Sequence, residues 1–239
     1  MSCRRRISIA LLGMAATLAT AAAFAESEAP QPLSREWRGE APRVGATCEP
    51  DDLRFAAAPM FRVRAATAGR VHFLARKERC RGNCPHLRAD SLAPGDIVFA
   101  GPEDRGFRCV AAGTPQGRLT GGFLAAENLA PAMPDTVLSG AFLIGTWRRH
   151  SSSLIRFFTR GPEGIVAQGS GTWRGTGTVN EGGFSAGFML IPPVLLLRDG
   201  ACAVIFERRG PYLLVNDNAR CGGNNVRFVG IYIRQPPQR

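Results

Sequence analysis

Short apolar runs separated by turn residues are the feature that most constrains how this chain folds. From Phe61 onward, these runs alternate with Gly, Pro and Asp-Gly turns roughly every 8–12 residues. That spacing is typical of antiparallel β-sheets and leaves no room for long amphipathic helices. The pattern predicts an all-β protein. The Asp199-Gly200 pair, which lies between two apolar runs, is its strongest hairpin signal.

The first 25 residues have the three parts of a secretory signal peptide. Residues 4–6 are three arginines, residues 7–23 are apolar, and Ala23-Phe24-Ala25 matches a cleavage site. We therefore expect a protein of the periplasm or the external medium, with no transmembrane segment after processing. Residues 26–58 follow as an extended leader without sustained periodicity.

Six cysteines remain beyond the signal peptide: Cys48, Cys80, Cys84, Cys109, Cys202 and Cys221. An even number in an oxidising compartment predicts three disulfides. Cys202 and Cys221 are expected to pair, because more than 90 residues separate them from the others. The remaining four allow three connectivities, of which we favour Cys80–Cys84 with Cys48–Cys109. The spacing is a poor match to a zinc site, and no metal is expected.

The turn pattern divides the chain into two β modules. The first covers residues 59–133, and the second covers residues 136–235. Strands in the first are expected at 70–74, 97–100, 107–111 and 119–124. Those in the second are expected at 142–147, 154–158, 164–168, 171–175, 184–190, 194–197, 201–207, 212–216 and 226–233. Eight or nine antiparallel strands in so short a module predict a small barrel or a sandwich, stapled by disulfides.

The first module resembles a bacterial Src-homology-3-like (SH3b) domain. The motifs that carry the resemblance are Pro94-Gly95-Asp96-Ile97-Val98, Gly106-Phe107-Arg108-Cys109-Val110, and Gly117 through Thr120-Gly121-Gly122-Phe123-Leu124 to Leu129. Phe123 stands where the family usually has a tryptophan. The resemblance implies a small SH3-like barrel that binds cell-wall or protein ligands.

The end of the chain is similar to a family of exported proteobacterial proteins of unknown function, in which the region often follows an SH3b-like domain. The matching residues are Gly210, Tyr212, Asp217, Asn218, Cys221, Gly222, Gly223, Asn225, Val226, Phe228, Gly230 and Tyr232. Asn and Gly suit tight turns, and Asp217 and Asn225 can cap backbone groups. We favour a scaffold role for this segment over a binding surface, which stays open as the alternative.

Motifs for catalysis and cofactors are weak. Residues 183–187 fit G-x-S-x-G, but the last histidine, His150, precedes the serine and Pro192-Pro193 excludes a long following helix. Neither a catalytic residue nor a cofactor is expected. Gly145-Thr146-Trp147 is similar to the G-x-W of lipocalins, which at most implies a lipocalin-like barrel able to hold a small ligand.

Positive charge is concentrated in the second module. The whole chain carries +11, of which residues 136–239 contribute +7, from 12 arginines against five acids. Genome composition explains arginine in place of lysine, but it does not explain this asymmetry. Candidate binding residues are Arg148, Arg149, Arg208, Arg209, Asp217, Asn218 and Asn225. An anionic partner is expected, either peptidoglycan, lipid head groups or a protein, and not nucleic acid in this compartment.

These observations together predict a non-enzymatic exported envelope protein that binds cell-wall or protein ligands. Two alternatives stay open. One is an inhibitor of a cell-wall-degrading enzyme, similar to lysozyme inhibitors. The other is a lipocalin-like barrel that binds a small ligand.

Overall fold

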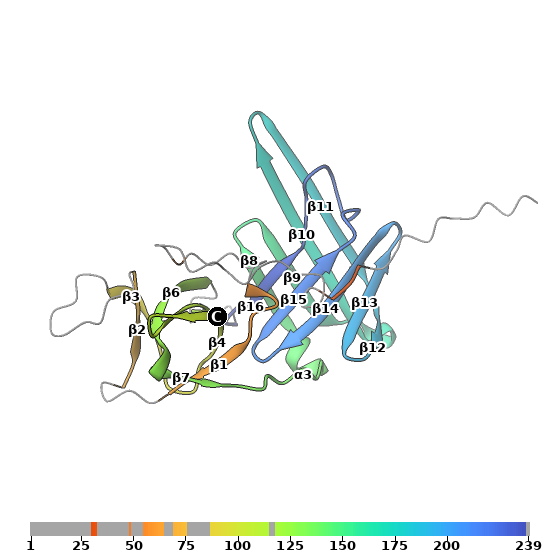
Figure 1. The fold of residues 1–239 in the computed structure, drawn as a ribbon. Helices are drawn as coiled ribbons and strands as arrows, with labels where there is room; N and C mark the ends of the chain where they lie inside the picture. Colours follow the sequence, from red (N-terminus) through yellow and green to blue (C-terminus); the bar gives the residue numbers. More distant parts are fainter. Residues whose placement is uncertain are drawn as a thin grey trace, which may run out of the picture.

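The computed structural model describes residues 30–32, 48, 55–64, 69–75, 87–114 and 118–237. The all-β class is confirmed, because strands arranged in two antiparallel sheets make up most of the described chain (Figure 1). Residues 1–25, which carry the predicted signal peptide, lie outside the described residues, as do Cys80 and Cys84.

The first sheet has seven strands in the order β3-β2-β6-β5-β4-β1-β7. Their bounds are Met60–Val63 (β1), Val71–Leu74 (β2), Leu87–Leu92 (β3), Ile97–Asp104 (β4), Phe107–Gly113 (β5), Leu119–Ala125 (β6) and Leu129–Pro131 (β7). A short 3-10 helix, η1 (Ala126–Asn128), connects β6 to β7. The four expected strands correspond to β2, β4, β5 and β6.

The second sheet has nine strands in the order β11-β10-β9-β8-β16-β15-β14-β13-β12. Their bounds are Gly145–His150 (β8), Ser153–Thr159 (β9), Ile165–Gly175 (β10), Thr178–Ala186 (β11), Phe188–Ile191 (β12), Val194–Asp199 (β13), Cys202–Arg209 (β14), Tyr212–Asp217 (β15) and Gly230–Arg234 (β16). The helix α3 (Gly140–Leu143) precedes them, and the 3-10 helix η2 (Gly161–Glu163) joins β9 to β10.

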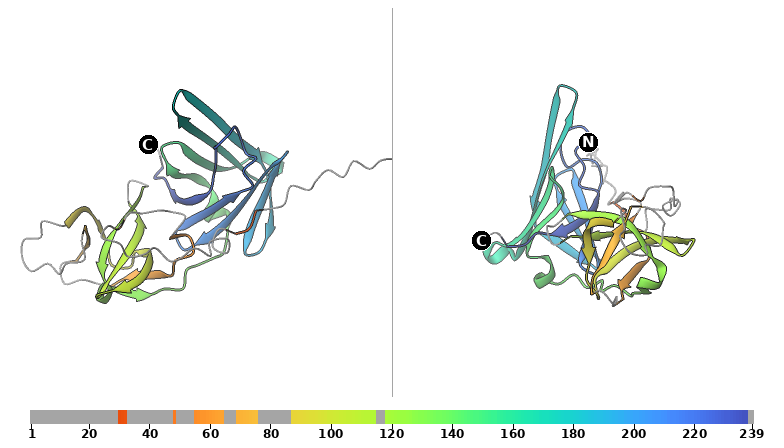
Figure 2. Two further views of the ribbon diagram at one scale, coloured as in Figure 1. Left: turned by 45° about the horizontal axis from the view of Figure 1, so that its top comes forward. Right: turned by 90° about the vertical axis from the view of Figure 1, so that its left-hand side faces the viewer.

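This second sheet is an up-and-down meander whose first and last strands pair. Trp147 and Arg148 on β8 lie opposite Arg234 and Ile233 on β16. The two ends of the strand order are β11 and β12, with only Gly187 between them in the chain. The expected barrel or sandwich is therefore one curled sheet that is open between β11 and β12, and the β10–β11 hairpin projects beyond it (Figure 2).

The concave side of the curled sheet is filled by side chains. Cys202, Val204 and Phe206 alternate into this core, as the sequence pattern predicts. Aromatic rings pack closely there, with the centroids of Phe184 and Phe228 4.9 Å apart. On β10, Gly169 leaves room for the Phe184 ring, because a Cβ atom at this position would collide with it.

Four expected boundaries in the second module differ from the structure. The strand expected at 142–147 begins only at Gly145, because the Ser139 side chain accepts a hydrogen bond from the Phe142 amide and caps α3. The strands expected at 164–168 and 171–175 are the single strand β10, whereas the one expected at 184–190 breaks at Gly187 into β11 and β12. The last strand begins at Gly230 rather than at Val226.

The two sheets share a hydrophobic core at their junction. Met60 and Phe99 of the first module pack with Leu214, Ile231 and Ile233 of the second. A nonpolar interface of this kind holds the modules against each other. Module one thus covers part of the convex face of β15 and β16.

Two of the three expected disulfides lie within the described residues, and both are confirmed. Cys48 is bonded to Cys109, which ties the leader to β5. Cys202 is bonded to Cys221. The pairing of Cys80 with Cys84 stays a prediction.

Candidate functional site

Arg208 and Arg209 hold the module junction. Arg208 makes a 2.8 Å ion pair with Asp135 and donates a 2.7 Å hydrogen bond to the carbonyl of Val137. Its guanidinium also lies 4.2 Å from the centre of the Phe142 ring. These groups engage the guanidinium at the junction, and the assignment of Arg208 to a binding surface stays a prediction.

Arg209 is engaged in the same way from the other side of the junction. It donates to the carbonyl oxygens of Ala56 and Ala58, and it lies over the Phe99 ring. Burial lowers the pKa of the Arg209 guanidinium from its usual value, and the charge of Glu207 opposes that shift. Both arginines were assigned from sequence as a surface pair, and the partners that bury them lie far away in the chain.

Asp217 and Asn218 also have structural roles. The buried Asp217 carboxylate accepts hydrogen bonds from the Arg227 Nε at 2.7 Å, from the Ala219 amide at 2.7 Å and from the Phe228 amide. Asn218 accepts from the Ala203 amide and donates to the Ala201 carbonyl. These contacts favour the scaffold interpretation of the C-terminal motif.

The loop after β15 is pressed against β11 by two glycines. Gly182 and Gly222 form an isolated bridge, and a Cβ atom on Gly182 would lie 2.5 Å from the Cα of Gly222. The amide of Gly223 donates a 3.1 Å hydrogen bond to the carbonyl of Glu181. The adjacent Cys221 is fastened to β14 through Cys202. This close approach accounts for the glycines of the motif, since any side chain would separate the two backbones.

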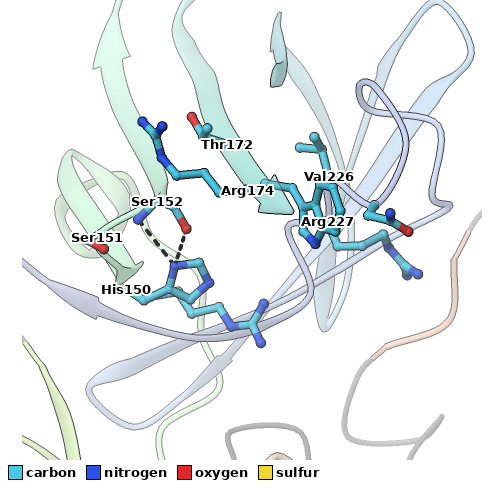
Figure 3. A pocket seen from close by; sticks show the side chains of 10 residues that line it. His150, Ser151, Ser152, Thr172, Arg174, Val226 and Arg227 are labelled. Atoms are coloured by element: carbon cyan, nitrogen blue, oxygen red, sulfur yellow. Dashed lines mark hydrogen bonds between the residues drawn. The ribbon is translucent and has the colours of Figure 1, made fainter. Parts of the chain in front are cut away.

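Three segments at one end of the curled sheet line an open cavity of about 450 Å³. They are the β8–β9 turn, the projecting part of β10, and the loop between β15 and β16 (Figure 3). The lining residues are Arg149, His150, Ser151, Ser152, Thr172, Trp173, Arg174, Asn225, Val226 and Arg227. Cavities at the mouths of β-barrels are frequent ligand sites.

The lining of this cavity, hereafter the mouth pocket, is basic. It contains three arginines and no carboxylate. Arg227 is committed to Asp217, whereas Arg174 is exposed on the projecting hairpin. The His150 Nδ1 lies 2.7 Å from the hydroxyl of Ser152, and the two side chains share one rim of the pocket (Figure 3). An anion is the ligand that such a lining favours electrostatically.

Trp173 contributes an indole to the pocket. Its six-membered ring lies over Gly175, where an added Cβ would collide with it. Among the described residues, no acceptor is paired with the Trp173 Nε1. By contrast, the fully buried Trp147 donates a 2.8 Å hydrogen bond to the carbonyl of Leu143. Buried or half-buried indoles usually find such a partner, which makes the Trp173 Nε1 a candidate donor to a ligand.

The sequence-predicted site residues therefore separate into groups. Arg149 and Asn225 line the mouth pocket, whereas Arg148 lies on the opposite face of β8 from the buried Trp147. Sequence reasoning missed Thr172, Trp173 and Arg174. Their signal is a tryptophan next to an arginine within the glycine-rich run of residues 169–177.

Arg148 belongs to a polar outer face of the sheet. On this face Arg156 lies between Thr146 on β8 and Gln168 on β10. Glu181 is the single acid in strands β8 to β11. It lies on β11, opposite Thr172 of β10 in the strand register. Within the described residues, no group of His, Cys, Asp and Glu could hold a metal ion, and no helix is long and apolar enough to cross a membrane.

The fold and the pocket define a disulfide-bonded protein of two antiparallel β modules with a basic pocket at one end. No protein-family model matches the chain, and no curated protein does. A solved structure from Nostoc punctiforme, a protein with unknown function from the DUF3598 family, is 14% identical in sequence. The alignment covers 52% of this chain and 50% of that chain, with a TM-score of 0.19.

Proposed function

We propose that this chain is a non-enzymatic exported protein of the bacterial envelope that binds an anionic cell-wall component through its second module. The SH3b-like resemblance of the first module and the predicted signal peptide belong to the same proposal. Periplasm or external medium is the compartment in which the disulfides Cys48–Cys109 and Cys202–Cys221 would persist.

One observation carries the proposal: the mouth pocket has Arg149 and Arg174 in its lining and no acid. The arginines of the outer face add positive potential beside it, because Glu181 is the single acid on the four strands concerned. Such a field attracts polyanions and weakens as salt screens it. Peptidoglycan, a sugar polymer that carries carboxylates, is the cell-wall polymer that this surface fits.

The packed concave side of the second sheet argues against the lipocalin-like alternative. Trp147, Phe157 and Phe206 are fully buried within it, so that side chains occupy the space where a lipocalin-like ligand would lie. The proposed site is therefore the mouth of the sheet rather than its interior. The inhibitor alternative is retained as an outcome of the experiment.

The test is co-sedimentation of the purified protein with peptidoglycan across a series of salt concentrations. We expect binding at low salt that declines as salt rises, and a reduction of about tenfold or more in the Arg149→Ala/Arg174→Ala variant, since each lost charged hydrogen bond weakens binding. Arg160→Ala is the matched control for the single variants Arg149→Ala and Arg174→Ala. Like each of them it removes one positive charge, at the opposite end of β9, where Arg160 pairs with the exposed Glu163.

Two results would contradict the proposal. One is binding that Arg149→Ala, Arg174→Ala and Arg160→Ala reduce equally, which would indicate nonspecific attraction. The other is absence of binding combined with inhibition of a muramidase, which would favour the inhibitor alternative.

A further inference from the structure

We propose that the mouth pocket binds an acidic sugar, with the acidic group near Arg174 and Arg149 and the sugar hydroxyls on the neutral donors around Trp173. This inference rests on the proposed function and deepens it, because it specifies which part of an anionic envelope polymer the pocket holds.

The size favours an occupant larger than a simple inorganic anion. A cavity of about 450 Å³ is comparable to sites for small organic molecules, which are roughly 300–1,000 Å³. A phosphate or sulfate ion would fill a small part of it and would leave most lining donors without an acceptor. A sugar ring that carries one acidic group occupies such a space and reaches several walls at once.

The donors in the lining are mostly neutral and suit hydroxyl groups. Ser151, Thr172 and Asn225 contribute hydroxyls and an amide, and Trp173 contributes its indole Nε1. Within the part of the chain that the structure describes, no acceptor is paired with that Nε1, although the indole is half-buried. Sugar hydroxyls both accept and donate hydrogen bonds, which matches a lining that mixes hydroxyl, amide and indole groups.

The backbone holds these donors in place. The amide of Thr172 donates a 2.9 Å hydrogen bond to the carbonyl of Ser152, which fixes β10 against the β8–β9 turn. The side-chain amide of Asn180 donates a 2.7 Å hydrogen bond to the carbonyl of Asn224, which fixes the loop between β15 and β16 against β11. Asn225 adopts a left-handed conformation with φ of 66°, which asparagine tolerates better than most residues. The pocket is therefore preorganised, and this reduces the entropic cost of binding.

The charge selects an acidic sugar over a neutral one. Arg174 is exposed on the hairpin wall, and Arg149 lines the pocket from β8. The carboxylate of Asp217 is neutralised by Arg227 at 2.7 Å and is buried behind the loop, so it does not cancel this potential. A peptide ligand would need apolar subsites for its side chains, whereas Val226 and the Trp173 ring are the apolar groups in the lining.

The test uses the ¹⁵N-labelled full-length protein and observes the indole N–H signals of its tryptophans, with Trp173→Phe to assign the Trp173 signal. The ligands are an oligosaccharide of galacturonic acid, glucose 6-phosphate, a neutral glucose oligomer, an acidic tetrapeptide and inorganic phosphate. The first two ligands separate a carboxylate from a phosphate source of the acidic group. We expect at least one acidic sugar to shift the Trp173 signal in a saturable manner.

The remaining ligands and the variants define specificity. The neutral oligomer, the peptide and inorganic phosphate should each bind at least about tenfold more weakly than the acidic sugar. Arg174→Ala should weaken binding of the acidic sugar by about tenfold, whereas Arg160→Ala should leave it unchanged. Trp173→Phe, followed through the backbone amide signals because its indole is absent, should weaken binding by a smaller factor. Because Arg174 is exposed, a dispersed spectrum of Arg174→Ala separates lost binding from lost folding.

The proposal is overturned if no acidic sugar shifts the Trp173 signal, or if inorganic phosphate, the neutral oligomer or the peptide binds as tightly as the acidic sugar. Its failure differs from failure of the proposed function. Arginine-dependent sedimentation with peptidoglycan but no response of Trp173 to acidic sugars would remove this inference and leave the proposed function. Saturable binding of an acidic sugar without sedimentation with peptidoglycan would remove the proposed function and leave the acidic-sugar site.

Discussion

The hydroxyl of Tyr212 on β15 donates a 2.6 Å hydrogen bond to the carbonyl oxygen of Ile97 on β4, and so connects the two sheets across their junction. The same hydroxyl accepts a 3.1 Å hydrogen bond from the amide of Gly113 on β5. Its ring lies 4.8 Å from that of Phe99. Tyr212, a residue of the C-terminal motif, therefore links the two modules through its hydroxyl. Removal of this hydroxyl should lower the stability of both modules.

Replacing Tyr212 by phenylalanine should lower the free energy of unfolding by about 1–3 kcal/mol. The substitution keeps the ring but leaves the partly buried carbonyl of Ile97 and the amide of Gly113 without their partner. Urea denaturation followed by circular dichroism measures the change. An unchanged midpoint would mean that the hydroxyl contributes nothing to the junction.

Stability should also decrease in alkaline solution because of Tyr212. Burial raises the pKa of its phenol well above the usual value of 10, so the folded state holds the proton more tightly than the unfolded chain does. This contribution is complete below about pH 10 and is lost as the pH rises further. We expect the free energy of unfolding to fall as the pH rises above about 10, and to fall less in Tyr212→Phe. Parallel pH profiles for the two proteins would contradict this expectation.

A methyl group at Gly182 should disturb the loop that carries the mouth pocket. Gly182→Ala places a Cβ atom against the Cα of Gly222, which should cost about 1–3 kcal/mol of stability. Gly187→Ala is the control, because nothing lies within 4 Å of a Cβ atom at that position. Thermal unfolding of both variants measures the difference, and equal melting temperatures would show that the two backbones can separate without cost.

Loss of the disulfide between Cys202 and Cys221 should destabilise the second module. The two cysteines are 19 residues apart, and a cross-link of that length stabilises a protein by about 3 kcal/mol. The double variant Cys202→Ser/Cys221→Ser should therefore unfold at lower urea concentration than the parent protein. Reduction of the parent should shift it in the same direction. A double variant as stable as the parent would mean that the packing of Val226 and Phe228 suffices to hold the loop.

The strands could be predicted because they depend on neighbouring residues. Alternation placed Cys202, Val204 and Phe206 on the core face, and Asp199-Gly200 marked the hairpin between β13 and β14. Cysteine spacing led to the pairing of Cys202 with Cys221. Each of these inferences needs only a local pattern or a count.

The site could not be predicted in the same way, because its contacts are distant in sequence. Arg209 bonds to the carbonyl of Ala56, 153 residues away, and nothing local distinguishes it from a surface arginine. The mouth pocket joins the β8–β9 turn, the end of β10 and the loop between β15 and β16; the strand around Trp173 is predicted correctly, but its place beside the other two segments is not visible in the sequence. The helix α3 was missed because its four residues are too few for a helical period to show.

Asp217 offers a test that separates scaffold from ligand binding. Asp217→Asn keeps the side-chain size but removes the negative charge that pairs with Arg227. It also replaces the carboxylate oxygen that accepts the hydrogen bond from the Phe228 amide. It should lower stability by about 2–4 kcal/mol, less than a fully buried pair would, because Arg227 is partly exposed. Peptidoglycan binding by the folded variant should be unchanged or stronger, since one negative charge beside the pocket is gone. Loss of binding in a variant whose stability matches the parent would instead place Asp217 among the ligand-binding residues.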